Sequence, residues 1–262
     1  MGREVARQLI RTAVIGIDCA TEPRKTGLAL GFREECATWL EAAEVGQSEA
    51  MLLDTLTGWL GTAERVLLSI DAPLGWPSGM AAALPSHQAG APLGGGAHAL
   101  FRRATDRFIR RRLGKQSLDV GADRIARTAF AALSVLHEIR KRGSLPIPLA
   151  WDRKFDGVVA IEVYPAATLR AHGMPDKGYK VPGGQSQRMA VIDRLGQHFD
   201  LRGHRSQLLS NVDVLDAAIC MLAGLDFEGG AAMPPENIYE ARREGWIWAR
   251  DPALRCSCIP VP

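Results

Sequence analysis

The stretch VIGID at residues 14–18 decides the fold, because its apolar run ends abruptly at Asp18. A second stretch, VLLSIDAP at residues 66–73, repeats the pattern and places Asp71 at the end of its run. Apolar runs of this kind predict strands that are buried in a sheet. A third stretch, VVAIEVYP at residues 158–165, carries Glu162 in a similar place. An ionised carboxylate beside a buried strand is costly unless it is paired or binds a metal, so the three acids together predict a cation site.

The rest of the chain predicts further strands and helices around these three. A polar turn separates the first strand from a second at residues 27–32, which predicts a hairpin, and residues 36–40 are expected to form a third strand. Apolar residues at helical spacing and Pro165 at a first helical position predict helices at 48–60, 99–113, 124–142, 187–198 and 212–225 and a short one from 165. A Gly- and Pro-rich stretch at 73–96 reads as a long loop. A hairpin first and crossovers later predict an α/β fold, a three-layer α/β/α domain with a mixed sheet.

Composition is that of an ordinary globular protein, with 47% hydrophobic and 23% charged residues in a chain of 262. We expect a single domain over residues 1–262, with its core at about 12–228 and a C-terminal tail at 229–262. The longest apolar runs are too short to span a membrane. Five scattered cysteines, an odd number, favour reduced thiols and a cytoplasmic protein. The pair Cys256 and Cys258 lacks further zinc ligands nearby, and its role stays open.

Five acids are candidates for one site outside the carboxyl ends of the strands, where α/β sheets form their sites. Asp18, Asp71 and Glu162 follow strands, whereas Asp213 and Asp216 are three residues apart on a helix and share a face. Such a cluster predicts one or two Mg²⁺ or Mn²⁺ ions. Two ions about 4 Å apart would activate a water molecule and stabilise the leaving oxygen in phosphodiester hydrolysis. The same acids would alternatively hold the Mg²⁺ of a bound nucleotide.

Each acid also has an ordinary structural explanation. Asp213 follows Ser210 at the spacing of a capping box, and an acid suits a helix N-terminus. Asp71 precedes Ala-Pro and would open a turn, as Asp18 would. Asp216 lies one turn deeper in its helix, where a capping role explains it poorly. The joint placement of the acids favours a functional site.

Seven short motifs occur along the chain in an order that is specific as a set. They are GID at 16–18, IDAPLG at 70–75, RATD at 103–106, EVYP at 162–165, GYK at 178–180, DVLDA at 213–217 and EGWI at 244–247. The sequence resembles the family catalogued as domain of unknown function 429, described as predicted nucleases of the ribonuclease H-like fold. The resemblance covers residues 12–249 and implies a five-stranded sheet with Asp18 on the first strand and Asp71 on the fourth. Asp18, Asp71 and the Asp213/Asp216 pair also look like the four-acid pattern of resolvase-type nucleases, in which glutamate is commoner at the place of Asp71.

A basic segment, FRRATDRFIRRRLGK at residues 101–115, has seven basic residues and one acid. Arg103, Arg107 and two further arginines fall on one helical face, which could hold a phosphate backbone or could be paired with acids elsewhere. Arg103 is spaced to pair with Asp106. The resemblance places Arg103 and Asp106 among the substrate-binding candidates. It also implies that Lys180 and Arg188 face the site and hold a substrate phosphate, with plain surface charge as the alternative.

These residues predict a metal-dependent nuclease acting on DNA or RNA. In this hypothesis Asp18 bridges two metal ions, Asp71 and Asp216 each complete one, and Glu162 or Asp213 supplies the remaining ligand or positions the water. One alternative is a nucleotide-binding phosphotransferase or ATPase-like protein, although residues 19–22 (CATE) are no Gly-rich phosphate loop. The other is a non-catalytic nucleic-acid-binding module, which would have no reason to keep a repelling acid cluster.

Overall fold

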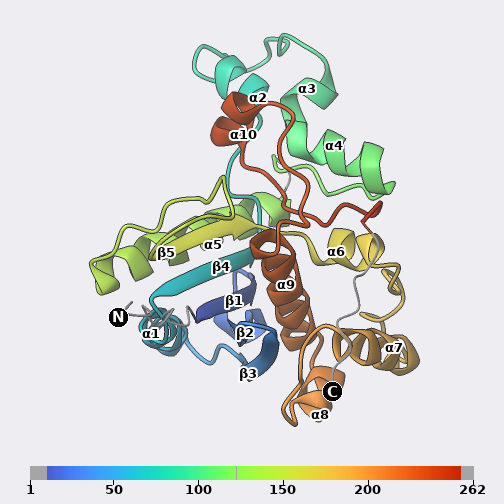
Figure 1. The fold of residues 1–262 in the computed structure, drawn as a ribbon. Helices are drawn as coiled ribbons and strands as arrows, with labels where there is room; N and C mark the ends of the chain where they lie inside the picture. The colour runs from blue at the N-terminus through green and yellow to red at the C-terminus, as the bar shows by residue number, and fades with distance from the viewer. Residues whose placement is uncertain (1–10, 122, 255–262) are drawn as a thin grey trace, which may run out of the picture.

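A five-stranded mixed sheet forms the centre of the molecule in a computed structural model that describes residues 11–121 and 123–254 (Figure 1). The strand order is β3-β2-β1-β4-β5. Strands β1, β4 and β5 are parallel, and β2 runs antiparallel to both of its neighbours. The strands are β1 (Thr12–Asp18), β2 (Gly27–Glu34), β3 (Ala37–Val45), β4 (Arg65–Asp71) and β5 (Val158–Glu162). Asp18 thus ends the first strand and Asp71 the fourth, as expected.

Helices cover both faces of the sheet, which confirms the three-layer α/β/α class (Figure 1). On one face, α1 (Glu49–Leu60) and α5 (Asp123–Gly143) pack against apolar side chains of β1, β2 and β4. On the other face, α9 (Val212–Glu228) lies across the sheet, with α6 (Pro165–Ala171), α7 (Gln185–Leu195) and α8 (Arg205–Ser210) around it. Among the described helices, none is long and apolar enough to cross a membrane.

A group of short helices stands beyond the sheet, at the top of Figure 1. It consists of α2 (Ser78–Ala83), α3 (Ala97–Phe101), α4 (Ala104–Leu113) and α10 (Ile238–Glu244), and we call these four helices the cap. Two expectations are corrected here. The stretch 73–96 is not loop throughout, because it contains α2, and the basic helix expected at 99–113 is broken into α3 and α4 at Arg102 and Arg103.

The C-terminal stretch is not a tail in its described part, up to residue 254. Trp246, Ile247, Trp248 and Ala249 are all buried in one apolar cluster with β5 and α9. The backbone N–H of Trp248 donates to the carbonyl of Glu162 at 2.9 Å, which adds a short extended segment beside the end of β5. The core therefore extends at least to Ala249. Cys256 and Cys258 lie outside the described residues.

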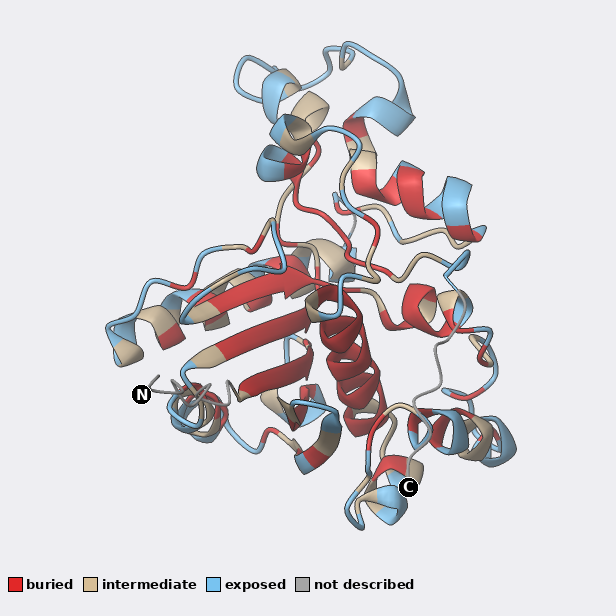
Figure 2. Ribbon diagram, in the orientation of Figure 1, coloured by how far each residue is buried: buried red, intermediate tan, exposed pale blue. Residues whose placement is uncertain are grey.

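Helix α9 is buried along most of its length, as Figure 2 shows in red. It packs directly on the backbone of β1, because glycine leaves room for it at the contact. A Cβ on Gly16 would lie 1.9 Å from the carbonyl oxygen of Ala217. Gly27 of β2 makes an equally close approach to the carbonyl of Asp213. These contacts fix the first turns of α9 over the carboxyl end of β1, where Asp18 stands.

Gly16→Ala is expected to destabilise the protein by about 1–3 kcal/mol, because backbone atoms on both sides cannot yield to the new methyl group. Gly58→Ala is the matched control. Gly58 lies on the exposed side of α1, and a Cβ there meets no atom within 4 Å, so the change is expected to stabilise by about 0.5–1 kcal/mol. Urea unfolding of both variants measures the difference, and an unaffected Gly16→Ala protein would contradict the close α9–β1 contact.

Candidate functional site

Asp18 and Asp71 are direct neighbours at the carboxyl ends of two parallel strands. They are paired across β1 and β4, and each is the last residue of its strand. Side chains alternate between the faces of a sheet, so Asp18 shares a face with Val14, which packs against α9. Both aspartates therefore point to the side of the sheet that α9 covers. Each is partly exposed to solvent.

Asp216 comes to the same place from α9 and is fully buried. The helix is capped by Asn211, whose side-chain oxygen accepts hydrogen bonds from the N–H groups of Asp213 and Val214. The alternative explanation, a capping box between Ser210 and Asp213, is therefore wrong. Asp213 stays partly exposed at the first turn, where Lys180 and Lys25 counter the rise that burial causes in its pKa.

Both oxygens of Asp216 have partners from one loop. The hydroxyl of Tyr179 donates to Oδ1 at 2.8 Å, and the ammonium of Lys180 forms an ion pair with Oδ2. Tyr179 is buried, whereas the side chain of Lys180 is 53% exposed. The loop thus brings a cation to the acids from the solvent side, and the sequence motif GYK at 178–180 is explained by this contact.

Arg188 supports this loop from α7. Its Nη1 donates to the carbonyl oxygen of Tyr179 at 2.9 Å. Gly178 opens the loop with a φ of +79°, a conformation that favours glycine. Arg188 was expected to bind a substrate phosphate. Its guanidinium instead binds the backbone of the loop that carries Tyr179 and Lys180.

The three acids influence one another strongly. Burial raises the pKa of Asp18, and the nearby carboxylates of Asp216 and Asp71 raise it further. Burial also raises the pKa of Asp71 to about 7, with Asp216 adding to the rise and Lys180 opposing it. When all three acids are ionised, Lys180 neutralises one of the three charges. The remaining negative charge gives the site a strong preference for a further cation.

The donor set suits Mg²⁺ or Mn²⁺, which prefer carboxylate oxygens, but the side chains are not arranged as a ready metal site. Within residues 11–121 and 123–254, no group of three or more His, Cys, Asp or Glu side chains converges closely enough to hold a metal ion. The ammonium of Lys180 lies on an oxygen of Asp216. The charge of the cluster therefore fits a divalent cation, whereas its side chains are not placed to bind one.

Glu162 does not belong to this cluster, which corrects its predicted role as a catalytic and metal-binding residue. In the parallel pairing of β4 and β5 it lies opposite Ile70, one residue before Asp71. Its side chain therefore leaves the sheet on the opposite face from Asp71. Both of its oxygens are also bound, Oε1 to Arg103 at 2.7 Å and Oε2 to Arg103 at 2.8 Å and to the N–H of Leu74 at 2.9 Å.

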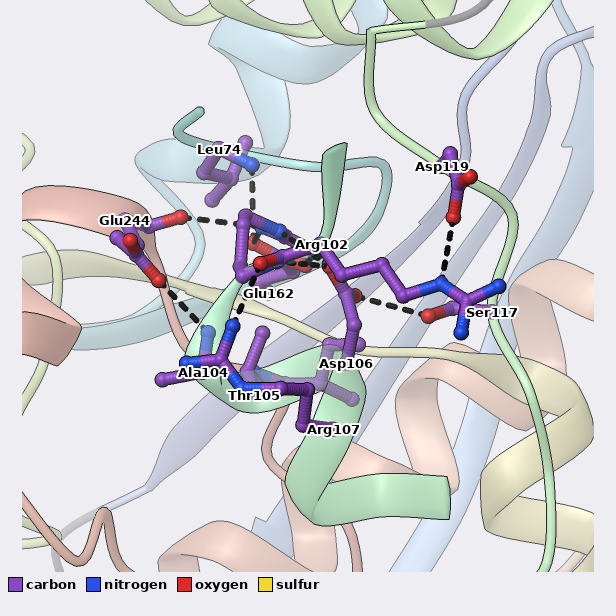
Figure 3. Close-up of polar contacts among 12 residues, drawn as sticks. Leu74, Arg102, Ala104, Thr105, Asp106, Arg107, Ser117, Asp119, Glu162 and Glu244 are labelled. Carbon is purple, nitrogen blue, oxygen red and sulfur yellow. Dashed lines mark hydrogen bonds and ion pairs between the residues drawn. The ribbon is translucent and has the colours of Figure 1, made fainter. Parts of the chain in front are cut away.

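A buried ionic network lies at the base of the cap, and Figure 3 shows its members Asp106, Glu162 and Glu244. By its hydrogen bonds, Arg103 is the centre of this network. Besides Glu162 it binds Asp106, with Nη2 at 3.1 Å from Oδ1 and Nε at 3.1 Å from Oδ2. Arg103 and Asp106 are each 1% exposed. The predicted pairing of these two residues is confirmed, but their predicted contact with substrate is wrong, because both side chains are buried and bind each other.

Glu244 extends this network, although its motif did not predict a site role for it. One carboxylate oxygen accepts from the N–H and hydroxyl of Ser78, each at 2.7 Å, and the other accepts from the N–H of Ala104 at 2.7 Å. Its carbonyl also accepts from Arg103 at 3.2 Å. The network thus joins α2, α4 and α10 to the end of β5. The motif EGWI at 244–247 was the available signal, but nothing in it indicated a partner.

The arginines of α4 are mostly paired with acids of the C-terminal segment. Arg111 binds Glu236 at 2.7 Å, and Arg107 lies 3.4 Å from Glu240. Arg112 likewise lies 3.4 Å from Asp251. The interpretation of a solvated, paired face therefore describes α4 better than that of a free phosphate-binding face.

Tyr164 is a further residue near the acids that sequence reasoning left out. It follows β5 and is partly exposed. Burial, together with the charge of Asp71, raises the pKa of its hydroxyl to about 12. The tyrosine therefore stays protonated at neutral pH and is able to donate a hydrogen bond. Cys19, beside Asp18, is buried, and burial and the acids raise its pKa to about 12, so it is no nucleophile.

A family model described as "Protein of unknown function (DUF429)" matches residues 16–240. The chain belongs to this family. No curated protein matches the chain. The DUF429 match includes all the acids of the site together with Tyr179 and Lys180, and it ends four residues before Glu244.

The raised pKa of Asp71 predicts a pH dependence of stability without metal. The pKa of this carboxyl rises on folding, from 3.8 to about 7. Its contribution to stability is therefore fully present when the pH is below the unfolded pKa, and it is lost as the pH rises to the folded pKa. Asp71→Asn should therefore gain stability relative to wild type as pH rises from about 4 to about 8. Urea unfolding of wild type and Asp71→Asn across that pH range measures the difference in unfolding free energy, with the exposed Asp156→Asn as control. A difference that does not change with pH would contradict the raised pKa of Asp71.

Proposed function

We propose that this DUF429 protein is a metal-dependent nuclease of the ribonuclease H-like fold, hydrolysing phosphodiester bonds in DNA or RNA. The observation that carries the proposal is the placement of Asp18 and Asp71, in register at two strand ends, near Asp216 of α9. The strand order, with an antiparallel β2 between β3 and β1, supports the proposed fold. The proposed cofactor is Mg²⁺ or Mn²⁺, because the acids carry more negative charge than Lys180 balances.

The roles follow from where the side chains stand. Asp18, Asp71 and Asp216 would hold the cation, and Asp213 at the outer edge would position the attacking water. The bound cation would activate that water and stabilise the leaving oxygen. Tyr179 fixes the orientation of Asp216 through its 2.8 Å hydrogen bond. Lys180, once released from Asp216, would hold a phosphate oxygen on the solvent side.

The proposed partner is a nucleic acid strand, and its phosphates would contact few residues. Most arginines of α4 are engaged with acids, so the attraction expected from that helix is reduced. Arg107 has a long contact with Glu240 and a 44% exposed side chain, so it stays a candidate for a phosphate contact. The cytoplasm is the compartment we propose, on the argument from scattered thiols, of which Cys19, Cys36 and Cys220 are free.

A nucleotide-binding ATPase-like function is less well supported. That function needs a Gly-rich loop after the first strand to bind phosphates. The connection from β1 to β2 instead contains a short 3₁₀ turn at Pro23–Lys25. A non-catalytic nucleic-acid-binding module is disfavoured by the acid cluster, which repels phosphate unless a cation is present.

The test is a cleavage assay on single- and double-stranded DNA and RNA, a DNA–RNA hybrid and a branched junction, each with Mg²⁺ or Mn²⁺. We expect cleavage of at least one substrate that stops when the metal is chelated. Full integrity of every substrate under all metal conditions, from a folded protein, would sink the proposal. Isothermal titration with ATP and Mg²⁺ examines the alternative, for which we expect no binding.

A further inference from the structure

Lys180 is placed differently from an ordinary surface lysine. Its ammonium reaches inward to Oδ2 of Asp216, a residue with no exposed side-chain surface, while more than half of the lysine side chain remains in solvent. Asp18 and Asp71 stand paired at the neighbouring strand ends. The lysine therefore supplies the positive charge that balances part of the acid cluster.

The loop that carries Lys180 is built so that this residue can leave while the rest stays. Tyr179 is anchored by its hydroxyl on Asp216 and by Arg188 on its carbonyl oxygen. On the other side, Gly183 has a φ of +82°, and a Cβ on Gly184 would lie 2.1 Å from the carbonyl of Gly178, so the loop closes tightly on itself. Lys180 stands between these fixed points and is held to the protein interior by its ammonium.

We propose that the ammonium of Lys180 is a built-in counter-ion that a divalent cation displaces from Asp216 when it binds. The inference rests on the proposed function, because it assigns the mode of metal entry at that same site. It explains why Lys180 reaches inward to a fully buried carboxylate while more than half of its side chain stays in solvent. In the metal-bound state the released ammonium faces solvent, where a substrate phosphate arrives.

The first consequence concerns metal affinity. A cation that has to displace Lys180 binds more weakly than one that enters an open carboxylate cluster. Lys180→Met, which keeps the length of the side chain and removes its charge, should therefore bind Mn²⁺ at least about tenfold more tightly than wild type. Lys177→Met is the matched control, because Lys177 is exposed on the same loop and should leave the affinity unchanged.

The second consequence is visible in the wild-type protein and needs no variant. Acylation of lysine amines, followed by peptide mass spectrometry, reports how free each ammonium is. Addition of Mn²⁺ should raise the acylation rate of Lys180 several-fold and leave that of Lys177 unchanged. A merely structural ion pair would show no such response.

The outcomes separate the inference from the proposed function. Tighter Mn²⁺ binding by Lys180→Met in isothermal titration, or metal-induced reactivity of Lys180, supports the displacement. Equal or weaker binding by Lys180→Met, together with unchanged reactivity in a wild type that does bind Mn²⁺, overturns the inference and leaves the metal site standing. Absence of Mn²⁺ binding in wild type and Lys180→Met alike overturns both.

Discussion

Asp18→Asn is expected to lower metal-dependent cleavage by about a hundred- to a thousandfold, the scale seen when a group that stabilises transition-state charge is removed. Asp18 ends the central strand β1 and adjoins both Asp71 and Asp216. Asparagine keeps the shape of the side chain and removes its charge, so the cation loses the ligand that would bridge the site. Single-turnover cleavage at saturating Mg²⁺ measures the loss.

The same variant should fold at least as well as wild type, which separates catalysis from stability. Burial and two neighbouring acids raise the pKa of Asp18, so its charge costs free energy in the folded state without metal. Removing that charge relieves the repulsion. Asp156→Asn, an exposed control, should change neither activity nor stability. Retention of activity in folded Asp18→Asn would remove this residue from the mechanism.

Arg103→Met is expected to destabilise the protein by about 3–5 kcal/mol, because it leaves buried carboxylates without their cation. Arg103 binds Glu162 and Asp106 and also touches the carbonyl of Glu244, all of them buried. Losing the arginine leaves two acids unpaired between the end of β5 and the cap. Equilibrium unfolding in urea measures the effect.

Arg111→Met is the matched control on α4. Its ion pair with Glu236 is 2.7 Å long but more than half exposed on both sides, so its loss should cost about 1 kcal/mol or less. Arg103→Lys should rescue little, because an ammonium cannot reproduce the forked contacts of the guanidinium. Similar losses for Arg103→Met and Arg111→Met would show that the network at the base of the cap adds little stability.

The strand-end aspartates were predictable because the signal is local. An apolar run that stops at an acid indicates both the buried strand and the exposed end of it, and Asp18 and Asp71 stand where this pattern places them. Glu162 shows the limit of the pattern. A shift of one residue in the pairing of β4 with β5 moves its side chain to the other face, and register between distant strands is set by packing that a single sequence does not display.

The basic segment at 101–115 shows a second limit. Helical spacing grouped Arg103 with Arg107 on one helix. In the structure the helix is interrupted before α4, and Arg103 is buried as the residue that precedes α4. The acids that pair with α4 lie more than a hundred residues away, on a C-terminal segment that looked like a tail. Tyr179 and Glu244 were missed for the same reason, since each acts through a partner distant in sequence.

The central claim is that Asp18, Asp71 and Asp216 form one cation site, and a crystal soaked in Mn²⁺ tests it most directly. We expect an anomalous-density peak for Mn²⁺ with carboxylate oxygens of these residues about 2.1 Å from the metal, and the ammonium of Lys180 withdrawn from Asp216. A saturated crystal with no manganese between these three acids, or with manganese bound elsewhere, would contradict it.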